Sequence, residues 1–389
     1  MSHSVIDRDS KVDADLSPEE LARYARHFGL PEMTLGAQKQ LKAARVLCIG
    51  AGGLGSPATL YLAAAGIGTI GLLDADAVEC SNLQRQILHG TKDIGRKKID
   101  SARDRLRDAN PNVNLELHNC EFNTLNAKEL VARYDIVIDG SDNLPTRYLS
   151  NDVCVSGHKP NIYGAVFRFE GQSTVFAPHL GGPCYRCLFP EPPPANSIPT
   201  CAEAGVLGVV PGIIGLIQAT ECIKLVIGRG QSLIGRMLQF DALKMQVREF
   251  NLPRDPQCPA CGQNPTTTFN PSDYQRSSCG TGLNVPTISV IELKRQMETK
   301  APLKIVDVRE PFEFDIARIE GAELIPLGQL PARLTHLSEN DDIVVMCKSG
   351  ARSANAVEVM QQAGLKGARN LEGGIDAWRE QVDPSLPRY

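Results

Sequence analysis

The first two thirds of the chain alternate short apolar runs with amphipathic segments, a pattern typical of an α/β protein. Apolar runs at residues 45–50 and 69–74 predict two strands, and the segment between them, 56–67, has the spacing of a helix. Further strand candidates lie at 114–122 and 135–140. Together these segments predict a mostly parallel sheet covered by helices.

Two later segments, 162–178 and 236–252, alternate apolar and polar residues and predict antiparallel strand pairs, the first around a Glu-Gly turn. After Cys261 the sequence becomes rich in Pro, Gly, Ser, Thr and Asn and loses all periodicity, which predicts a linker. A second α/β pattern then begins, with strands at 304–309 and 342–347. The predicted parts are a domain over 17–262, a linker over 263–285 and a second domain over 286–389.

Composition narrows the class of protein. The chain has 389 residues, 42% hydrophobic and 22% charged, with a net charge of −4 and no basic tract, so we expect neither direct nucleic-acid binding nor a membrane partner. The polar, acidic N-terminus does not resemble a signal peptide, and the most apolar stretch, 206–217, is too short to span a bilayer. We therefore expect a cytoplasmic protein, whose 12 cysteines serve as ligands, nucleophiles or core residues.

A glycine-rich turn follows the first strand. Its spacing is G-x-G-x-x-G over residues 50–55, and a serine and a proline then begin the helix. Glycines let the backbone approach a phosphate, and the helix N-terminus offers free N–H groups. The alternative is a tight turn without a ligand, but the strand before it and the helix after it favour nucleotide binding.

The charged residues near the glycine turn indicate which kind of nucleotide it binds. Asp74, at the end of the second strand, is placed to accept hydrogen bonds from ribose hydroxyls, and NAD would also satisfy this arrangement. A nucleoside triphosphate additionally needs fixed cations and a carboxylate for Mg²⁺. Candidates for these groups occur at 23–26, 81–86, Lys98 and 140–143.

Several of these segments resemble the sequence motifs of a known enzyme family. GAGGLGSP, LLDAD, SNLQRQ, DGSDN, PCYRC and TCAEAGV are similar, in order and spacing, to the ubiquitin-activating-like adenylyltransferases of the molybdenum-cofactor and thiamine pathways. The match covers residues 17–262 and implies a Rossmann-like fold that binds ATP and Mg²⁺. The implied nucleotide-binding residues are Gly50, Gly52, Gly53, Gly55, Asp74, Asn82, Arg85 and Lys98. The resemblance also implies that Asp142 holds Mg²⁺ and that Arg26 reaches the phosphates of the partner subunit in a homodimer.

Two CxxC pairs stand far apart in the sequence. Their members are Cys184, Cys187, Cys258 and Cys261. Four thiolates suit a closed tetrahedral Zn²⁺ site, which leaves no open position for chemistry and therefore predicts a structural role. The alternative is a set of unligated surface cysteines.

Cys201 lies in a proline-rich segment that predicts an exposed loop, a setting that suits a reacting thiol. A buried or incidental cysteine is the alternative. Its surroundings, TCAEAGV, resemble the crossover-loop cysteine of the same family, which favours the functional interpretation.

The C-terminal domain contains the loop CKSGARS, in which Arg352 stands five positions after Cys347. This spacing is one residue shorter than in cysteine-dependent phosphatases, so the loop suits a single anionic sulfur, with Lys348 and Arg352 stabilising a persulfide. DVREPFEF, IEGAELIPLGQL and LEGGIDAW around it resemble a rhodanese domain over 286–385.

The two halves together resemble adenylyltransferase–sulfurtransferases that activate ubiquitin-like sulfur carriers. The resemblance implies adenylation of a carrier's C-terminal Gly-Gly carboxylate, followed by transfer of persulfide sulfur from Cys347 to give a thiocarboxylate. Cys201 would resolve an acyl disulfide or form a thioester first. The sulfur donor would be a cysteine desulfurase or thiosulfate, and the pathway that of molybdopterin, cysteine, thiamine or thiolated transfer RNA. The alternatives are an NAD-dependent oxidoreductase with a fused rhodanese domain and a non-catalytic scaffold that docks the carrier.

Overall fold

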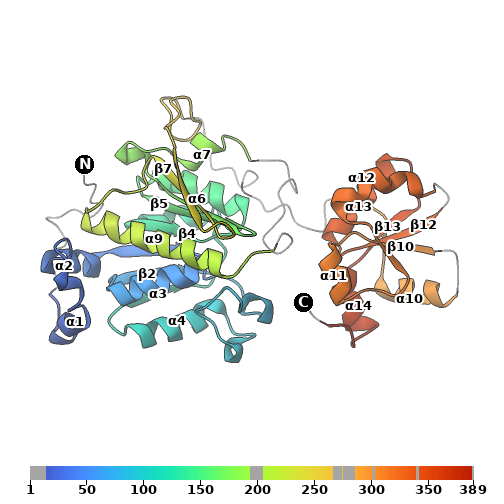
Figure 1. Cartoon of the computed structure of the whole chain (residues 1–389), viewed down its shortest axis with the longest axis horizontal. Helices are drawn as coiled ribbons and strands as arrows, with labels where there is room; N and C mark the ends of the chain where they lie inside the picture. The colour runs from blue at the N-terminus through green and yellow to red at the C-terminus, as the bar shows by residue number, and fades with distance from the viewer. Residues whose placement is uncertain are drawn as a thin grey trace. The chain divides into compact units, whose positions relative to one another are not determined.

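A computed structural model describes residues 15–192, 205–265, 274, 285–299, 303–338 and 341–387. The chain divides into two compact units, Met1–Gln275 and Arg276–Tyr389 (Figure 1). Each unit contains its own sheet with helices on both faces, which confirms the predicted α/β class.

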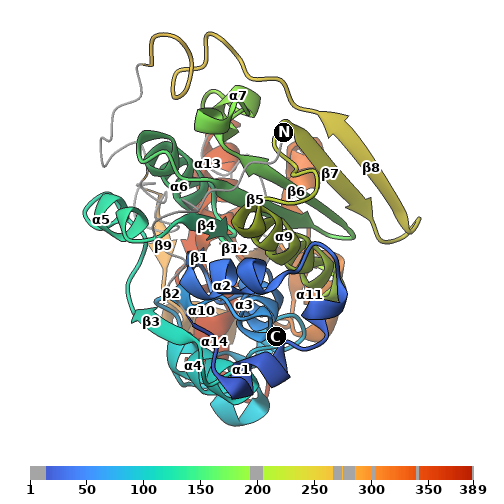
Figure 2. The same cartoon turned by 90° about the vertical axis from the view of Figure 1, so that its left-hand side faces the viewer.

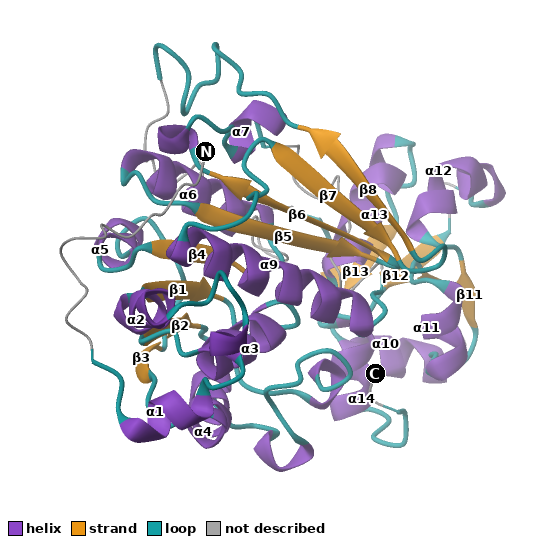
Figure 3. Cartoon of the chain, turned by 60° about the vertical axis from the view of Figure 1, so that its left-hand side comes forward, coloured by secondary structure: helices purple, strands orange, loops and turns teal. Residues whose placement is uncertain are grey.

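The sheet of the first unit has eight strands in the order β3-β2-β1-β4-β5-β6-β7-β8. The strands are β1 (Arg45–Ile49), β2 (Thr69–Leu73), β3 (Asn114–His118), β4 (Ile136–Asp139), β5 (Asn161–Phe167), β6 (Glu170–Phe176), β7 (Arg236–Asp241) and β8 (Gln246–Asn251). Strands β3 to β5 pair in parallel, while β5 to β8 pair antiparallel, and β7 and β8 form one end of the sheet (Figures 2 and 3). The turn between β5 and β6 contains Arg168, whose φ is 53°. It comes before the Glu-Gly pair where the sequence predicted the turn, because β6 already begins at Glu170.

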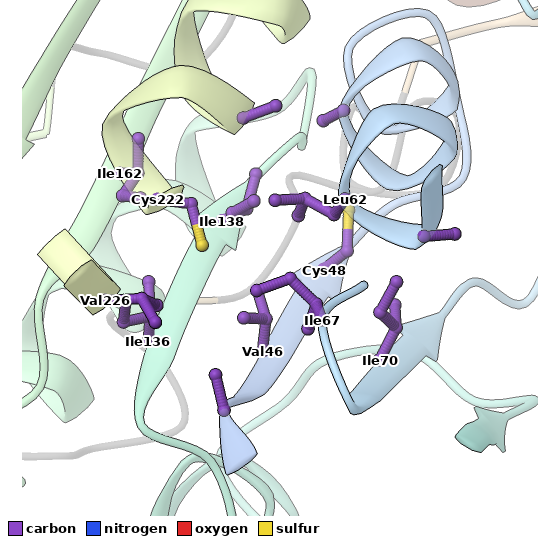
Figure 4. Packing of buried hydrophobic residues seen from close by; sticks show 14 of the residues in the cluster. Val46, Cys48, Leu62, Ile67, Ile70, Ile136, Ile138, Ile162, Cys222 and Val226 are labelled. Atoms are coloured by element: carbon purple, nitrogen blue, oxygen red, sulfur yellow. The ribbon is translucent and has the colours of Figure 1, made fainter. Parts of the chain in front are cut away.

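Helices cover both faces of this sheet. They are α1 (Pro18–Arg23), α2 (Leu35–Ala43), α3 (Gly55–Ala65), α4 (Lys98–Ala109), α5 (Ala127–Ala132), α6 (Leu144–Ser156), α7 (Tyr185–Leu188) and α9 (Val209–Ile227). Because side chains alternate along a strand, Val46 and Cys48 of β1 pack among α2, α3, α4 and α9, while Leu47 and Ile49 pack among α5, α6 and α7. Figure 4 shows the first of these two cores, in which Cys48, Leu62 and Cys222 come from β1, α3 and α9.

Helix α9 extends well beyond the apolar stretch recognised in the sequence, since it continues to Ile227. By length and composition it is the one helix in the described part of the chain that could cross a membrane, but 61% of its most apolar window is buried within the protein. It packs against α3 and strands β5 and β6, as a core helix does.

The second unit has a five-stranded parallel sheet in the order β11-β10-β12-β13-β9. Its strands are β9 (Thr287–Ile288), β10 (Leu303–Asp307), β11 (Ala322–Leu324), β12 (Asp342–Met346) and β13 (Ala368–Leu371). Its helices are α10 (Val290–Glu298), α11 (Pro311–Ile316), α12 (Leu330–Arg333), α13 (Ala351–Gln362) and α14 (Gly374–Gln381). Val306 and Val345 point into one core, and Ile305 and Val344 into the other.

Candidate functional site

The register of the parallel strands brings three loops together at one edge of the first sheet. Ile49 of β1 pairs with Leu73 on one side and with Asp139 on the other. The glycine turn, the segment after β2 and the segment after β4 therefore all begin at the same edge. Parallel α/β sheets bind ligands at this carboxyl edge.

The glycine turn depends on the absence of side chains. Gly50 has a φ of 96°, a conformation that L side chains rarely adopt, and its N–H donates to the Leu73 carbonyl at 2.8 Å. A Cβ on Gly55 would lie 1.9 Å from the Gly50 carbonyl oxygen. These two glycines therefore allow the chain to turn sharply from β1 into α3.

Asp74 connects the second strand to this turn. Its Oδ2 accepts a hydrogen bond from the Ala51 N–H at 2.9 Å. Burial raises the pKa of the Asp74 carboxyl, and Lys98, whose Nζ lies 3.9 Å from Oδ1, works in the opposite direction. Lys98 is itself buried and pairs with Asp76 at 2.8 Å. The structure thus places Asp74 and Lys98 side by side at the glycine turn.

The SNLQRQ segment lies against the same turn. A Cβ on Gly53 would come within 3.4 Å of Arg85 Cγ, and one on Gly52 within 3.7 Å of Gln86 Nε2. Arg85 Nη1 donates to the Ser81 carbonyl at 3.1 Å, while Asn82 Oδ1 accepts from the Glu79 N–H at 3.4 Å. Arg85 therefore joins the glycines, Asp74 and Lys98 in one region.

Asp142 is exposed in the segment between β4 and α6, and Asn143 caps that helix through the Thr146 N–H. The buried Asp139 supports this segment, since its Oδ1 accepts from the Ser141 N–H at 3.0 Å and its Oδ2 from the Ser150 hydroxyl at 2.7 Å. Sequence reasoning missed Asp139, although a carboxylate that ends a fully apolar strand was a usable signal.

Arg26 lies elsewhere in the chain. It is exposed two residues after Tyr24, and the Tyr24 ring packs at Gly66, where α3 ends. The 11 residues of α3 span about 16 Å from Gly55 at the glycine turn to this end. The structure therefore does not bring Arg26 to the glycine turn of its own chain.

The two CxxC pairs come together in a buried cluster. The Sγ atoms of Cys184 and Cys258 are 3.5 Å apart, those of Cys187 and Cys261 are 3.4 Å apart, and all four lie within 4.8 Å of one another. Four sulfurs at the usual Zn–S distance would be separated by about 3.8 Å. The arrangement therefore fits a closed four-sulfur metal site.

In the second unit, Cys347 follows β12 and is buried at the start of the CKSGARS loop. Its Sγ accepts hydrogen bonds from the Gly350 N–H at 3.1 Å and from the Ser353 hydroxyl at 3.2 Å. Gly350 has a φ of 95° and precedes α13, so the loop curls around the sulfur. Sequence reasoning gave no role to Ser353, because only the folded loop turns its hydroxyl toward the thiol.

Arg352 forms a buried ion pair with Glu313 of α11. Its two Nη atoms lie 2.6 and 2.8 Å from the Glu313 carboxylate oxygens. Burial alone would raise the pKa of the Glu313 carboxyl, but the Arg352 hydrogen bonds and the Glu310 N–H together lower it below its usual value. The pair is therefore ionised at neutral pH, and its net charge is zero.

Asp307 and Arg309 form a second ion pair next to Glu313, and Arg309 Nη1 donates to the Glu313 carbonyl at 3.4 Å. Both are fully buried, and Arg309 Nε donates to Asp307 Oδ1 at 2.9 Å while Nη2 donates to the Ala317 carbonyl at 2.7 Å. Asp307 pairs with Met346 in the sheet, so the loops after β10 and β12 start side by side. This register places α11 next to the sulfur loop. Cys201, the remaining predicted reactive residue, lies outside the described residues.

Fold and site together define a Rossmann-like nucleotide-binding unit fused to a unit with a cysteine loop. Family models agree with this division: the ThiF family matches residues 24–260 and the rhodanese-like domain matches residues 289–381. The chain belongs to the ThiF family and contains a C-terminal rhodanese-like domain, which confirms both resemblances.

Curated relatives share both parts. The chain is 44% identical to a probable adenylyltransferase/sulfurtransferase MoeZ of Mycobacterium tuberculosis, covering 96% of each chain. It is 42% identical to the adenylyltransferase and sulfurtransferase MOCS3 of Bos taurus, covering 97% of this chain and 89% of the relative. Among solved structures, E. coli MccB with ATP has a TM-score of 0.53 at 24% identity, covering 62% of this chain and 74% of MccB. This likeness concerns the fold alone.

Proposed function

We propose that the protein is an enzyme that adenylates the C-terminal Gly-Gly carboxylate of a ubiquitin-like sulfur carrier and then converts it to a thiocarboxylate. The observation that carries the proposal is the presence, in one chain, of a nucleotide-binding edge and a loop built to hold a reactive sulfur. Relatives similar over nearly the whole length have names that combine the same two activities. A cytoplasmic location fits this chemistry.

In the first step, an oxygen of the carrier carboxylate attacks the α-phosphate of ATP, and pyrophosphate leaves. The N–H groups of the glycine turn and the Arg85 guanidinium bind phosphate oxygens, Asp74 accepts hydrogen bonds from the ribose, and Lys98 lies beside it. Asp142 would hold Mg²⁺, which neutralises phosphate charge when bound. The product is an acyl-adenylate, in which the carboxylate has become an electrophile.

In the second step, the persulfide on Cys347 attacks the acyl carbon and displaces AMP, which gives an acyl disulfide. A thiolate at Cys201 then attacks the Cys347 sulfur, so that the thiocarboxylate leaves and a disulfide remains for reduction by a cellular thiol. In the alternative order, Cys201 first takes the acyl group as a thioester. Either route consumes one sulfane sulfur per carrier.

ATP–pyrophosphate exchange tests the first step. With Mg²⁺ and a panel of small carriers ending in Gly-Gly, we expect exchange with one carrier only, because the acyl acceptor must be recognised before the α-phosphate reacts. NAD binding without ATP binding would instead favour an oxidoreductase, and carrier binding without exchange would favour a scaffold.

We further propose that the enzyme is a homodimer in which Arg26 acts on the partner's nucleotide, since Arg26 lies toward the far end of α3 from its own glycine turn. Arg26→Ala and Asp142→Ala subunits should each be inactive in exchange. When equal amounts are mixed and allowed to reassociate, half of the dimers are mixed and each has one intact site, so about a quarter of wild-type activity should return. Mixtures that stay inactive, although subunits exchange, would show that Arg26 acts within its own chain.

A further inference from the structure

Two neutral hydrogen-bond donors of the described loop contact the reactive sulfur. The Cys347 Sγ accepts from a backbone N–H and from the Ser353 hydroxyl, both within 3.2 Å. The guanidinium of Arg352, the residue next to Ser353, faces the Glu313 carboxylate instead. Lys348 lies half-buried in the same loop.

Glu313 is held firmly in this position. It lies in the first turn of α11, where its Oε2 also accepts the Glu310 N–H at 3.0 Å. Only 5% of its side chain and 15% of that of Arg352 are exposed. A bidentate pair with this little exposure has a fixed geometry, so Arg352 cannot turn toward a ligand without breaking two hydrogen bonds to a buried carboxylate.

We propose that Glu313 determines which sulfur donors the loop accepts, by cancelling the charge of Arg352 and so disfavouring dianionic donors relative to neutral persulfides. This inference rests on the proposed sulfur-transfer function of Cys347 and specifies the class of sulfur donor that this function uses. Glu313 is a positioning residue, because it acts through Arg352.

The two donor classes differ in the charge that they bring to the loop. When the Cys347 thiolate attacks the outer sulfur of thiosulfate, the S–S bond breaks and sulfite leaves, so three negative charges share the site throughout. When it attacks the outer sulfur of a neutral persulfide R–S–SH, the R–S⁻ group leaves and only one negative charge is present. Because Glu313 neutralises the charge of Arg352, the site stabilises the reaction with the persulfide better than the reaction with thiosulfate.

The test measures how fast Cys347 of the full-length protein takes up sulfur in a single turnover. The readout is the increase in mass of the peptide that contains Cys347. Thiosulfate and an alkyl persulfide, which reacts through its protonated form R–S–SH, are the two donors. Glu313→Gln keeps the size of the side chain and one acceptor oxygen but removes the negative charge, so the loading rate constant with thiosulfate should rise about tenfold relative to that with the persulfide. Arg352→Gln removes the cation while the Glu313 carboxylate keeps its charge, so it should shift the same ratio in the opposite direction.

Asp315→Asn is the matched control, since Asp315 is exposed on the same helix and loses the same charge. It should leave the ratio unchanged. An unchanged ratio in Glu313→Gln, or an equal loss with both donors, would overturn the proposal. Loading requires neither ATP nor a carrier, so failure of the proposed adenylation would appear in pyrophosphate exchange and leave this result intact.

Discussion

Replacement of Cys347 by alanine is expected to abolish thiocarboxylate formation while leaving ATP–pyrophosphate exchange at its wild-type rate. The thiol is the group that receives sulfur in our proposal, and the two described groups in contact with it, the Ser353 hydroxyl and the Gly350 N–H, only donate hydrogen bonds to it. Loss of a covalent nucleophile typically lowers turnover by roughly a thousandfold or more. Adenylation uses residues of the first unit, which the substitution does not touch.

The measurement is the mass of the carrier after incubation with ATP and a sulfur donor, taken beside the exchange assay. Cys120→Ala is a suitable control, because Cys120 is a partly exposed cysteine of the first unit with no role in either step. It should behave as wild type in both assays. If Cys347→Ala still yields thiocarboxylate, sulfur reaches the carrier by another path. If it also loses exchange, the two activities are not separate steps.

Removal of the metal from the four-cysteine cluster is the second change with a large expected effect. We propose that the cluster holds Zn²⁺, whose four thiolate ligands connect α7 to the segment around Cys258 and Cys261. Cys258→Ser should lose the metal and lower the free energy of unfolding of the first unit by roughly 5 kcal/mol or more, because metal binding and folding are coupled in such sites. The second unit has its own core and should remain folded.

Metal content by mass spectrometry and thermal unfolding by calorimetry test this prediction. The wild type should contain roughly one zinc ion per chain, and a strong chelator should reproduce the effect of Cys258→Ser. Cys120→Ser again serves as the control. Loading of Cys347 from a sulfur donor should survive in Cys258→Ser, while exchange should disappear. An unchanged unfolding midpoint without metal would exclude a structural metal.

The sequence by itself determined the features that depend on local spacing. Apolar runs separated by helical segments predicted the parallel part of the first sheet, and the glycine spacing after residues 45–50 predicted the turn from β1 to α3. The two CxxC pairs predicted a four-cysteine cluster, because each pair already places two ligands close together. The strands, the glycine turn and each CxxC pair can be recognised in the sequence because the residues that form each of them are close together along the chain.

Only the tertiary structure decided which distant residues meet. The register of β10 with β12 brings Glu313 to Arg352, 39 residues away, and the turn of the sulfur loop aims the Ser353 hydroxyl at Cys347. Contacts of this kind depend on how strands align in space, which no local pattern specifies.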